Sequence, residues 1–125
     1  MTKKLLAAAK AAQRRAHAPY SKFRVGAAVL TKSGKIYTGC NVENASYGLT
    51  ICAERVAITK AVSEGHRQFE AIAVVAPSQA LSPCGACRQF LAEFGDLTVL
   101  CADSRNTKRV RSYRLAELLP HVFKL

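Results

Sequence analysis

The segment Ala71–Ala76, with the sequence AIAVVA, constrains the fold more than any other part of the chain. It is a continuous apolar run, without the alternation that marks a strand exposed on one face. Such a strand is covered on both sides, as the central strands of α/β proteins are. We therefore expect an α/β fold with three layers, α-β-α, in which this strand lies in the middle of the sheet.

The rest of the chain supplies further helices and strands around this segment. Turn residues and apolar periodicity predict four helices, at Thr2 to about Ala16, Ile51–Glu64, Pro83 to about Phe94, and Ala116–Leu119. They predict five strands, at Arg24–Leu30, Ile36–Asn41, Ala71–Ala76, Thr98–Ala102 and Arg109–Tyr113. Thr2 is expected to cap the first helix. We expect residues 1–125 to form a single domain.

The link between the last two strands fixes their relative direction. Only residues 103–108 separate them. Parallel neighbours need a crossover of roughly a dozen residues or more. If the fourth and fifth strands pair, they must therefore be antiparallel, and the five-stranded sheet must be mixed.

The N-terminal segment resembles a secretion signal for only a few residues. Its apolar stretch Leu5–Ala9 is short, and Lys10 and Arg14 bring positive charge directly after it. We interpret the segment as an amphipathic helix rather than an export signal. No apolar run approaches the roughly 20 residues of a membrane span. A cytoplasmic protein without a membrane partner is expected, and its five cysteines favour thiols or metal ligands over disulfides.

The chain is strongly basic, with 19 Lys and Arg against 8 Asp and Glu and a net charge of +11. Such a charge suits nucleic acid or phosphate partners, or simply a soluble basic surface. The basic residues are scattered, and the dense group is Lys108, Arg109, Arg111 and Arg114. No aromatic residues interleave with basic ones in a stripe. We therefore do not expect nucleic acid to be the native partner.

Two cysteines lie close together in Ser82–Phe90, SPCGACRQF. The C-x-x-C spacing alone fits a redox pair, half of a structural zinc site or part of a catalytic one. A third cysteine, Cys52, stands at the start of another predicted helix, two residues before Glu54. Helix N-termini favour thiolates. Three thiolates leave one zinc position open, which is typical of a catalytic site.

These two halves, C-x-E and P-C-x-x-C, have the layout of zinc-dependent nucleobase deaminases in their three-cysteine variant. Five ordered motifs extend the match over nearly the whole chain: Ala18–Val29, Gly39–Gly48, Cys52–Arg55, Ser82–Phe90 and Glu117–Phe123. The sequence resembles the small, homotetrameric, zinc-dependent cytidine deaminases of nucleoside salvage. The resemblance implies a cytidine deaminase-like sandwich that hydrolyses cytidine and deoxycytidine to uridine and deoxyuridine.

The same resemblance assigns roles in the chemistry. One zinc ion per subunit would be held by Cys52, Cys84 and Cys87. Glu54 would be the catalytic residue that carries a proton from water to the pyrimidine N3 and then to the leaving amine. Arg55 would donate hydrogen bonds to the thiolates and offset their negative charge.

The resemblance also assigns the binding of the nucleoside. The sugar would be held by Asn41 and Glu43, and the base would contact Phe23 and the backbone of Ala53, Ser82 and Cys84. A neighbouring subunit would supply Ala45, Tyr47 and Phe123, so that the sites of a homotetramer are shared between chains.

Three other functions remain open at this stage. An enzyme that edits nucleic acid would use the same chemistry, although the expected antiparallel pair and the short chain disfavour it. A blasticidin S deaminase shares the zinc layout, and a zinc-stabilised binding module would have no activity. Cys40 and Cys101 are expected to be buried small apolar residues, and none of the three histidines lies at a ligand position.

Overall fold

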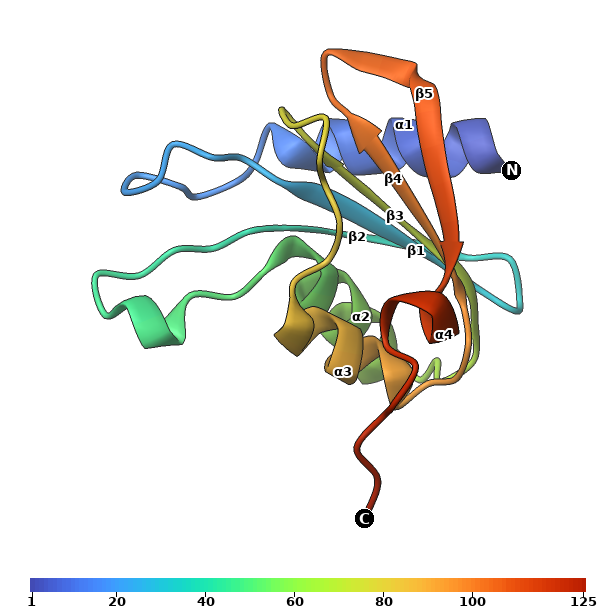
Figure 1. Ribbon diagram of the computed structural model, residues 1–125. Coiled ribbons are helices and arrows are strands. Elements are labelled where there is room, and N and C mark those ends of the chain that lie inside the picture. The colour runs from blue at the N-terminus through green and yellow to red at the C-terminus, as the bar shows by residue number, and fades with distance from the viewer.

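The computed structural model describes residues 1–125 and places their helices on both sides of one five-stranded sheet (Figure 1). The strands lie in the order β2-β1-β3-β4-β5. Their bounds are Gly26–Thr31 for β1, Ile36–Cys40 for β2, Phe69–Ala76 for β3, Thr98–Asp103 for β4 and Asn106–Arg114 for β5. The apolar run Ala71–Ala76 is thus central, as its pattern predicted.

The sheet is mixed in the expected way. β3 pairs in parallel with β4 and antiparallel with β1, while β1 pairs antiparallel with β2. β4 and β5 are antiparallel, with Cys101 opposite Arg111. The short link between these two strands leaves no room for a crossover helix, which confirms the prediction.

The helices form the outer layers. Their bounds are Thr2–Gln13 for α1, Ala53–Ser63 for α2, Gly85–Ala92 for α3 and Leu115–Leu118 for α4, with a short 3₁₀ turn, η1, at Tyr47–Leu49. Figure 1 shows α1 on one face of the sheet and α2, α3 and α4 on the other. Apolar residues of β3 alternate between two cores, with Ile72 facing α2 and Ala73 and Val75 facing α1. No helix has the length and apolar character needed to cross a membrane.

The first helix is shorter than predicted, and its predicted cap was wrong. Met1 is the N-cap residue, without a side-chain hydrogen bond, and Thr2 is already helical. After Gln13 the backbone N–H groups bond to carbonyls three residues back, which tightens the chain into a turn. His17 then donates its N–H to the Asn41 carbonyl at 3.0 Å. This bond to a distant segment ends the helix before Ala16.

The first strand begins two residues later than predicted. The side chain of Asn41 takes the hydrogen bonds that a neighbouring strand would otherwise make with residues 23–25. Asn41 Oδ1 accepts the Val25 N–H at 2.9 Å, and Asn41 Nδ2 donates to the Phe23 carbonyl at 2.8 Å. These backbone groups therefore bond to one amide rather than to a neighbouring strand.

Helices α2 and α3 begin at the cysteines rather than before them. Cys52 and Cys84 are the N-cap residues, with extended backbones. Cys84 Sγ accepts the Cys87 N–H at 3.5 Å, so the thiol itself caps α3. The helix ends at Ala92, before the predicted Phe94, and Gly95 follows with a φ of +102°.

Two glycines allow the helices to approach the sheet closely. A Cβ at Gly26 would lie 2.0 Å from the Ala9 carbonyl oxygen, and one at Gly39 would lie 2.5 Å from the Ala57 backbone nitrogen. Backbone atoms of α1 and α2 cannot move aside as a flexible side chain can. We expect Gly26→Ala and Gly39→Ala each to lower the free energy of unfolding by about 1–3 kcal/mol.

Urea denaturation of the zinc-loaded protein would measure this loss. Lys3→Ala is the control, because Lys3 is exposed on α1 and its side chain makes no ion pair. Its urea midpoint should stay at the wild-type value, and equal midpoints for all three variants would contradict the close packing.

Candidate active site

Three cysteine side chains meet where α2 and α3 begin. The sulfur atoms of Cys52, Cys84 and Cys87 all lie within 4.8 Å of one another, and Cys52 Sγ is 3.9 Å from Cys84 Sγ. Sulfurs bound tetrahedrally at about 2.3 Å from one zinc lie roughly 3.8 Å apart. The spacing of this cysteine triad therefore suits one zinc ion with an open fourth position.

Arg55 lies beside the triad. Its Nη2 donates to Cys52 Sγ at 3.3 Å, and this bond raises the pKa of the guanidinium. Its Nε is buried and has no hydrogen-bond partner in the chain. A buried donor of this kind is costly unless an acceptor faces it, and ionised sulfur is such an acceptor. The contact therefore fits a triad that carries negative charge.

The thiols of the triad differ in acidity. Hydrogen bonds from Cys87 and Arg55 lower the pKa of Cys52 to about 5. The bond to Cys52 raises the pKa of Cys87, because Cys87 keeps the proton that the two sulfurs share. The lowered pKa of Cys52 favours its thiolate at neutral pH, and metal binding would displace protons from the triad.

Glu54 lies in the first turn of α2 and is 4% exposed. Burial raises its pKa to about 7, and the neighbouring Cys52 charge acts in the same direction. A carboxyl group with such a pKa can both accept and release a proton near neutral pH. It lies two residues after Cys52 in the chain, and both Cys52 and Cys87 influence its pKa, so it is next to the triad.

Asn41 and Phe23 are brought together by the hydrogen bonds that end β2 and begin β1. Asn41 is 8% exposed, and its amide holds the backbone of residues 23 and 25. The oxygen keeps one lone pair and the nitrogen one hydrogen beyond these bonds. Phe23 is 39% exposed, so its ring remains available to a ligand.

Glu43 is fixed by two residues that the sequence motifs did not single out. Its Oε1 accepts the N–H groups of Tyr20 and Ser21 at 3.0 and 3.1 Å, and its Oε2 accepts the Ser21 hydroxyl. The Ser21 hydroxyl bond lowers the pKa of Glu43. Tyr20 and Ser21 both lie within the motif Ala18–Val29, and this was the sequence feature that could have pointed to their role.

Arg88 was also missed, although it follows directly on the C-x-x-C motif. Its Nε donates to the Pro83 carbonyl at 2.7 Å, and its Nη2 donates to Ser82 Oγ at 3.0 Å. Its Nη1 reaches the Leu118 carbonyl at 2.8 Å. This arginine ties the loop that carries Ser82 and Cys84 to the end of α4.

The residues expected to come from a neighbouring subunit do not join the triad within one chain. Tyr47 is 75% exposed and packs its ring against Tyr20 at 5.9 Å between centroids. Phe123 is 70% exposed, and its backbone bonds to the side chain of Gln89 on α3. Ala45 is exposed, whereas Ala53 is fully buried at the start of α2.

The remaining cysteines and all three histidines lie outside the triad. Cys101 is 1% exposed, as predicted. Cys40 is only half-buried, so its predicted burial was wrong in degree. It lies on β2, an edge strand on which only Gly39 is fully covered.

Comparisons with known proteins agree with this geometry. Residues 1–103 match the family described as the cytidine and deoxycytidylate deaminase zinc-binding region. The chain is 54% identical over 123 residues to a probable cytidine deaminase of Dictyostelium discoideum, covering 96% of this chain and 82% of that protein. It is 50% identical over 123 residues to a cytidine deaminase of Sporosarcina psychrophila, covering 96% and 89%.

The crystal structure of cytidine deaminase from Burkholderia pseudomallei superposes with a TM-score of 0.93 at 48% identity, covering 98% of this chain and 99% of that one. The family match includes the triad, whose spacing suits one zinc ion. Together with half-identical relatives along nearly the full length, these findings show that the chain belongs to the zinc-dependent cytidine deaminase family.

Proposed function

We propose that this protein hydrolyses cytidine and deoxycytidine to uridine and deoxyuridine, with release of ammonia, in pyrimidine salvage. One observation carries the proposal: three sulfurs at two helix starts lie next to a carboxyl group that is 4% exposed. A closed structural zinc site would need a fourth protein ligand and would not need Glu54. Membership of the family supports the same substrate class.

The triad holds the metal in this proposal. Zinc held by Cys52, Cys84 and Cys87 would supply an acidified water as the nucleophile. Arg55 donates a hydrogen bond to Cys52, and the N-termini of α2 and α3 direct their positive ends at the sulfurs. These positive groups offset the charge of the thiolates, which would otherwise weaken the acidification.

Glu54 moves the protons. It accepts one from the attacking water and delivers it to the pyrimidine N3. It then takes the second proton from the oxygen now bonded to C4 and gives it to the amine, which leaves as ammonia. The water oxygen remains on C4, so cytidine and water become uridine and ammonia. A pKa of about 7 suits both directions of transfer at neutral pH.

The nucleoside is recognised by groups already held in place. Asn41 and Glu43 bind the sugar hydroxyls with the lone pairs and hydrogen that their bonds to residues 20–25 leave free. The Phe23 ring packs against the base. The backbone of Ala53, Ser82 and Cys84 reads the polar edge of the base.

The active form is a homotetramer with sites shared between subunits. The segment of residues 42–51 extends away from the sheet in Figure 1. Its exposed apolar residues include Val42, Tyr47, Leu49 and Ile51. Contiguous apolar exposure of this kind marks a protein interface. Ala45, Tyr47 and Phe123 of one subunit then complete the site of another.

We further propose that residues 1–125 act as one domain in the cytoplasm. The match to the zinc-binding family covers residues 1–103, and β5, which follows it, belongs to the same sheet. All five cysteines are free thiols, and a reducing compartment keeps the triad able to bind metal.

Replacing Glu54 tests the proton transfer. We expect Glu54→Gln to lower kcat for cytidine by about 10²–10⁴-fold, because the amide cannot accept the water proton. Zinc content should stay at one per chain. The decay of the ultraviolet band of cytidine measures the rate, with Glu64→Gln, at the exposed end of α2, as the matched control.

A wild-type protein that contains zinc and leaves cytidine unchanged would reject the proposed substrate. Single-stranded RNA or DNA and blasticidin S would then be the substrates to assay.

Replacing Cys87 tests the metal site. We expect Cys87→Ser to lose zinc and deaminase activity together, because the hydroxyl does not ionise to replace the thiolate. Cys40→Ser, outside the triad, should keep both. Elemental analysis of dialysed protein measures the metal, and full zinc occupancy in Cys87→Ser would rule out Cys87 as a ligand.

Mixing two inactive variants tests the shared sites. Glu54→Gln lacks its own proton carrier, whereas Phe123→Ala lacks the aromatic ring that it gives to a neighbour. Co-expressed chains should form tetramers in which some sites contain both intact residues, and activity should return. Light scattering should show four chains per particle, and active monomers at high dilution would contradict the sharing of sites.

A further inference from the structure

A cavity of about 350 Å³, lined mostly by polar and charged residues, lies between the β4–β5 hairpin and the loop that joins β3 to α3. None of the metal-binding cysteines or sugar-binding residues described above lines it. Its lining residues are Gln79, Cys101, Asp103, Asn106, Arg109 and Arg111. Two of these six are arginines and one is a carboxylate, so the charge of the cavity decides what it can bind.

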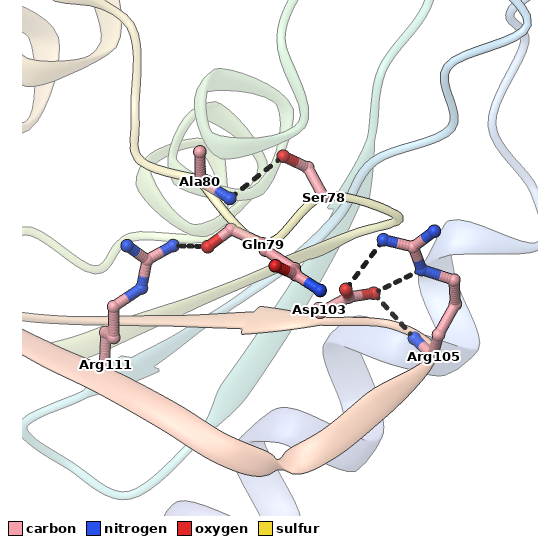
Figure 2. Close-up of polar contacts among 6 residues, drawn as sticks. All are labelled: Ser78, Gln79, Ala80, Asp103, Arg105 and Arg111. Carbon is pink, nitrogen blue, oxygen red and sulfur yellow. Dashed lines mark hydrogen bonds and ion pairs between the residues drawn. The ribbon is translucent and has the colours of Figure 1, made fainter.

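The carboxylate, Asp103, is paired with a cation of the same chain, Arg105. Arg105 donates from Nε to Asp103 Oδ1 at 3.0 Å and from Nη2 to Oδ2 at 2.8 Å, and its backbone N–H also bonds to Oδ1. Figure 2 shows this pair on one side of Gln79 and Arg111 on the other. The charge of Asp103 is therefore balanced by Arg105, and Asp103 makes no ion pair with either lining arginine.

The two arginines keep donors available. Arg111 uses Nη2 for the carbonyl oxygens of Gln79 and Leu81, which are uncharged, and its Nε and Nη1 make no bond in the chain. The side chain of Arg109 takes part in no hydrogen bond or ion pair. Residues two apart on a strand share a face, so Arg109 and Arg111 lie on the same side of β5.

We propose that this cavity binds a phosphate group. The planar donor fork of arginine matches phosphate oxygens with two parallel hydrogen bonds, and two such forks with no acidic partner favour a dianion. The side chains of Gln79 and Asn106 add amide donors that no group in the chain occupies. The volume lies within the range of small-molecule sites, so an organic part of the ligand also fits.

This site gives a physical reason for part of the positive charge. A neutral nucleoside needs none of the +11 net charge, yet Arg109 and Arg111 belong to the dense basic group of β5. The phosphate comes either from the free anion or from a phosphate monoester such as a nucleotide. Both present the same dianion to the arginines.

Titration of the zinc-loaded protein with inorganic phosphate tests the proposal by calorimetry. We expect saturable binding that Arg109→Ala and Arg111→Ala each weaken by about tenfold or more. Arg109 is the cleaner position, because it supports no other group in the chain. Arg14→Ala, an exposed arginine at the end of α1, is the matched control and should leave the Kd within about twofold.

A second titration identifies the source of the phosphate. Cytidine 5′-monophosphate is added to zinc-loaded Glu54→Gln protein, which cannot consume it. Tighter binding than inorganic phosphate, weakened again by Arg109→Ala, assigns the site to a nucleotide, and equal affinities assign it to the free anion. No saturable binding of either, or binding unchanged in both arginine variants, overturns the proposal. Neither titration measures turnover, so failure here is distinct from failure of the deaminase activity.

Discussion

The meeting of two helix N-termini at three sulfurs is the interaction on which the rest of the structure depends. Each thiolate brings negative charge into a partly buried place, and only positive groups on several sides make that stable. The starts of α2 and α3 and the guanidinium of Arg55 supply them. The same arrangement sets the position of Glu54, which must lie one residue beyond the N1 position of α2 and is buried there.

The groups proposed to bind substrate are held before substrate arrives. Asn41 and Glu43 bond to the backbone of residues 20–25, and Arg88 holds the loop before Cys84 against α4. Groups that are already ordered lose little conformational entropy on binding, which favours correct orientation of the nucleoside. In contrast, Tyr47 and Phe123 are mostly exposed, which is consistent with a site that another subunit completes.

The loop between β3 and α3 connects the zinc triad with the basic cavity. On one side it carries Ser82 and Cys84, and on the other its carbonyl oxygens accept hydrogen bonds from Arg111. Two arginines on different elements, Arg88 on α3 and Arg111 on β5, thus hold opposite parts of one loop. The uncharged carbonyls leave the charge of Arg111 uncompensated, which is the physical basis for expecting an anion there.

The sequence by itself determined the features that depend on short stretches. The apolar run Ala71–Ala76 indicated the central strand, the six-residue link indicated antiparallel β4 and β5, and C-x-E with P-C-x-x-C indicated the zinc chemistry. Only the tertiary structure decided where α1 ends, why β1 begins at Gly26, and that Ser21 and Arg88 support the site. Each of these results depends on a hydrogen bond between residues far apart in the chain, which local periodicity does not encode.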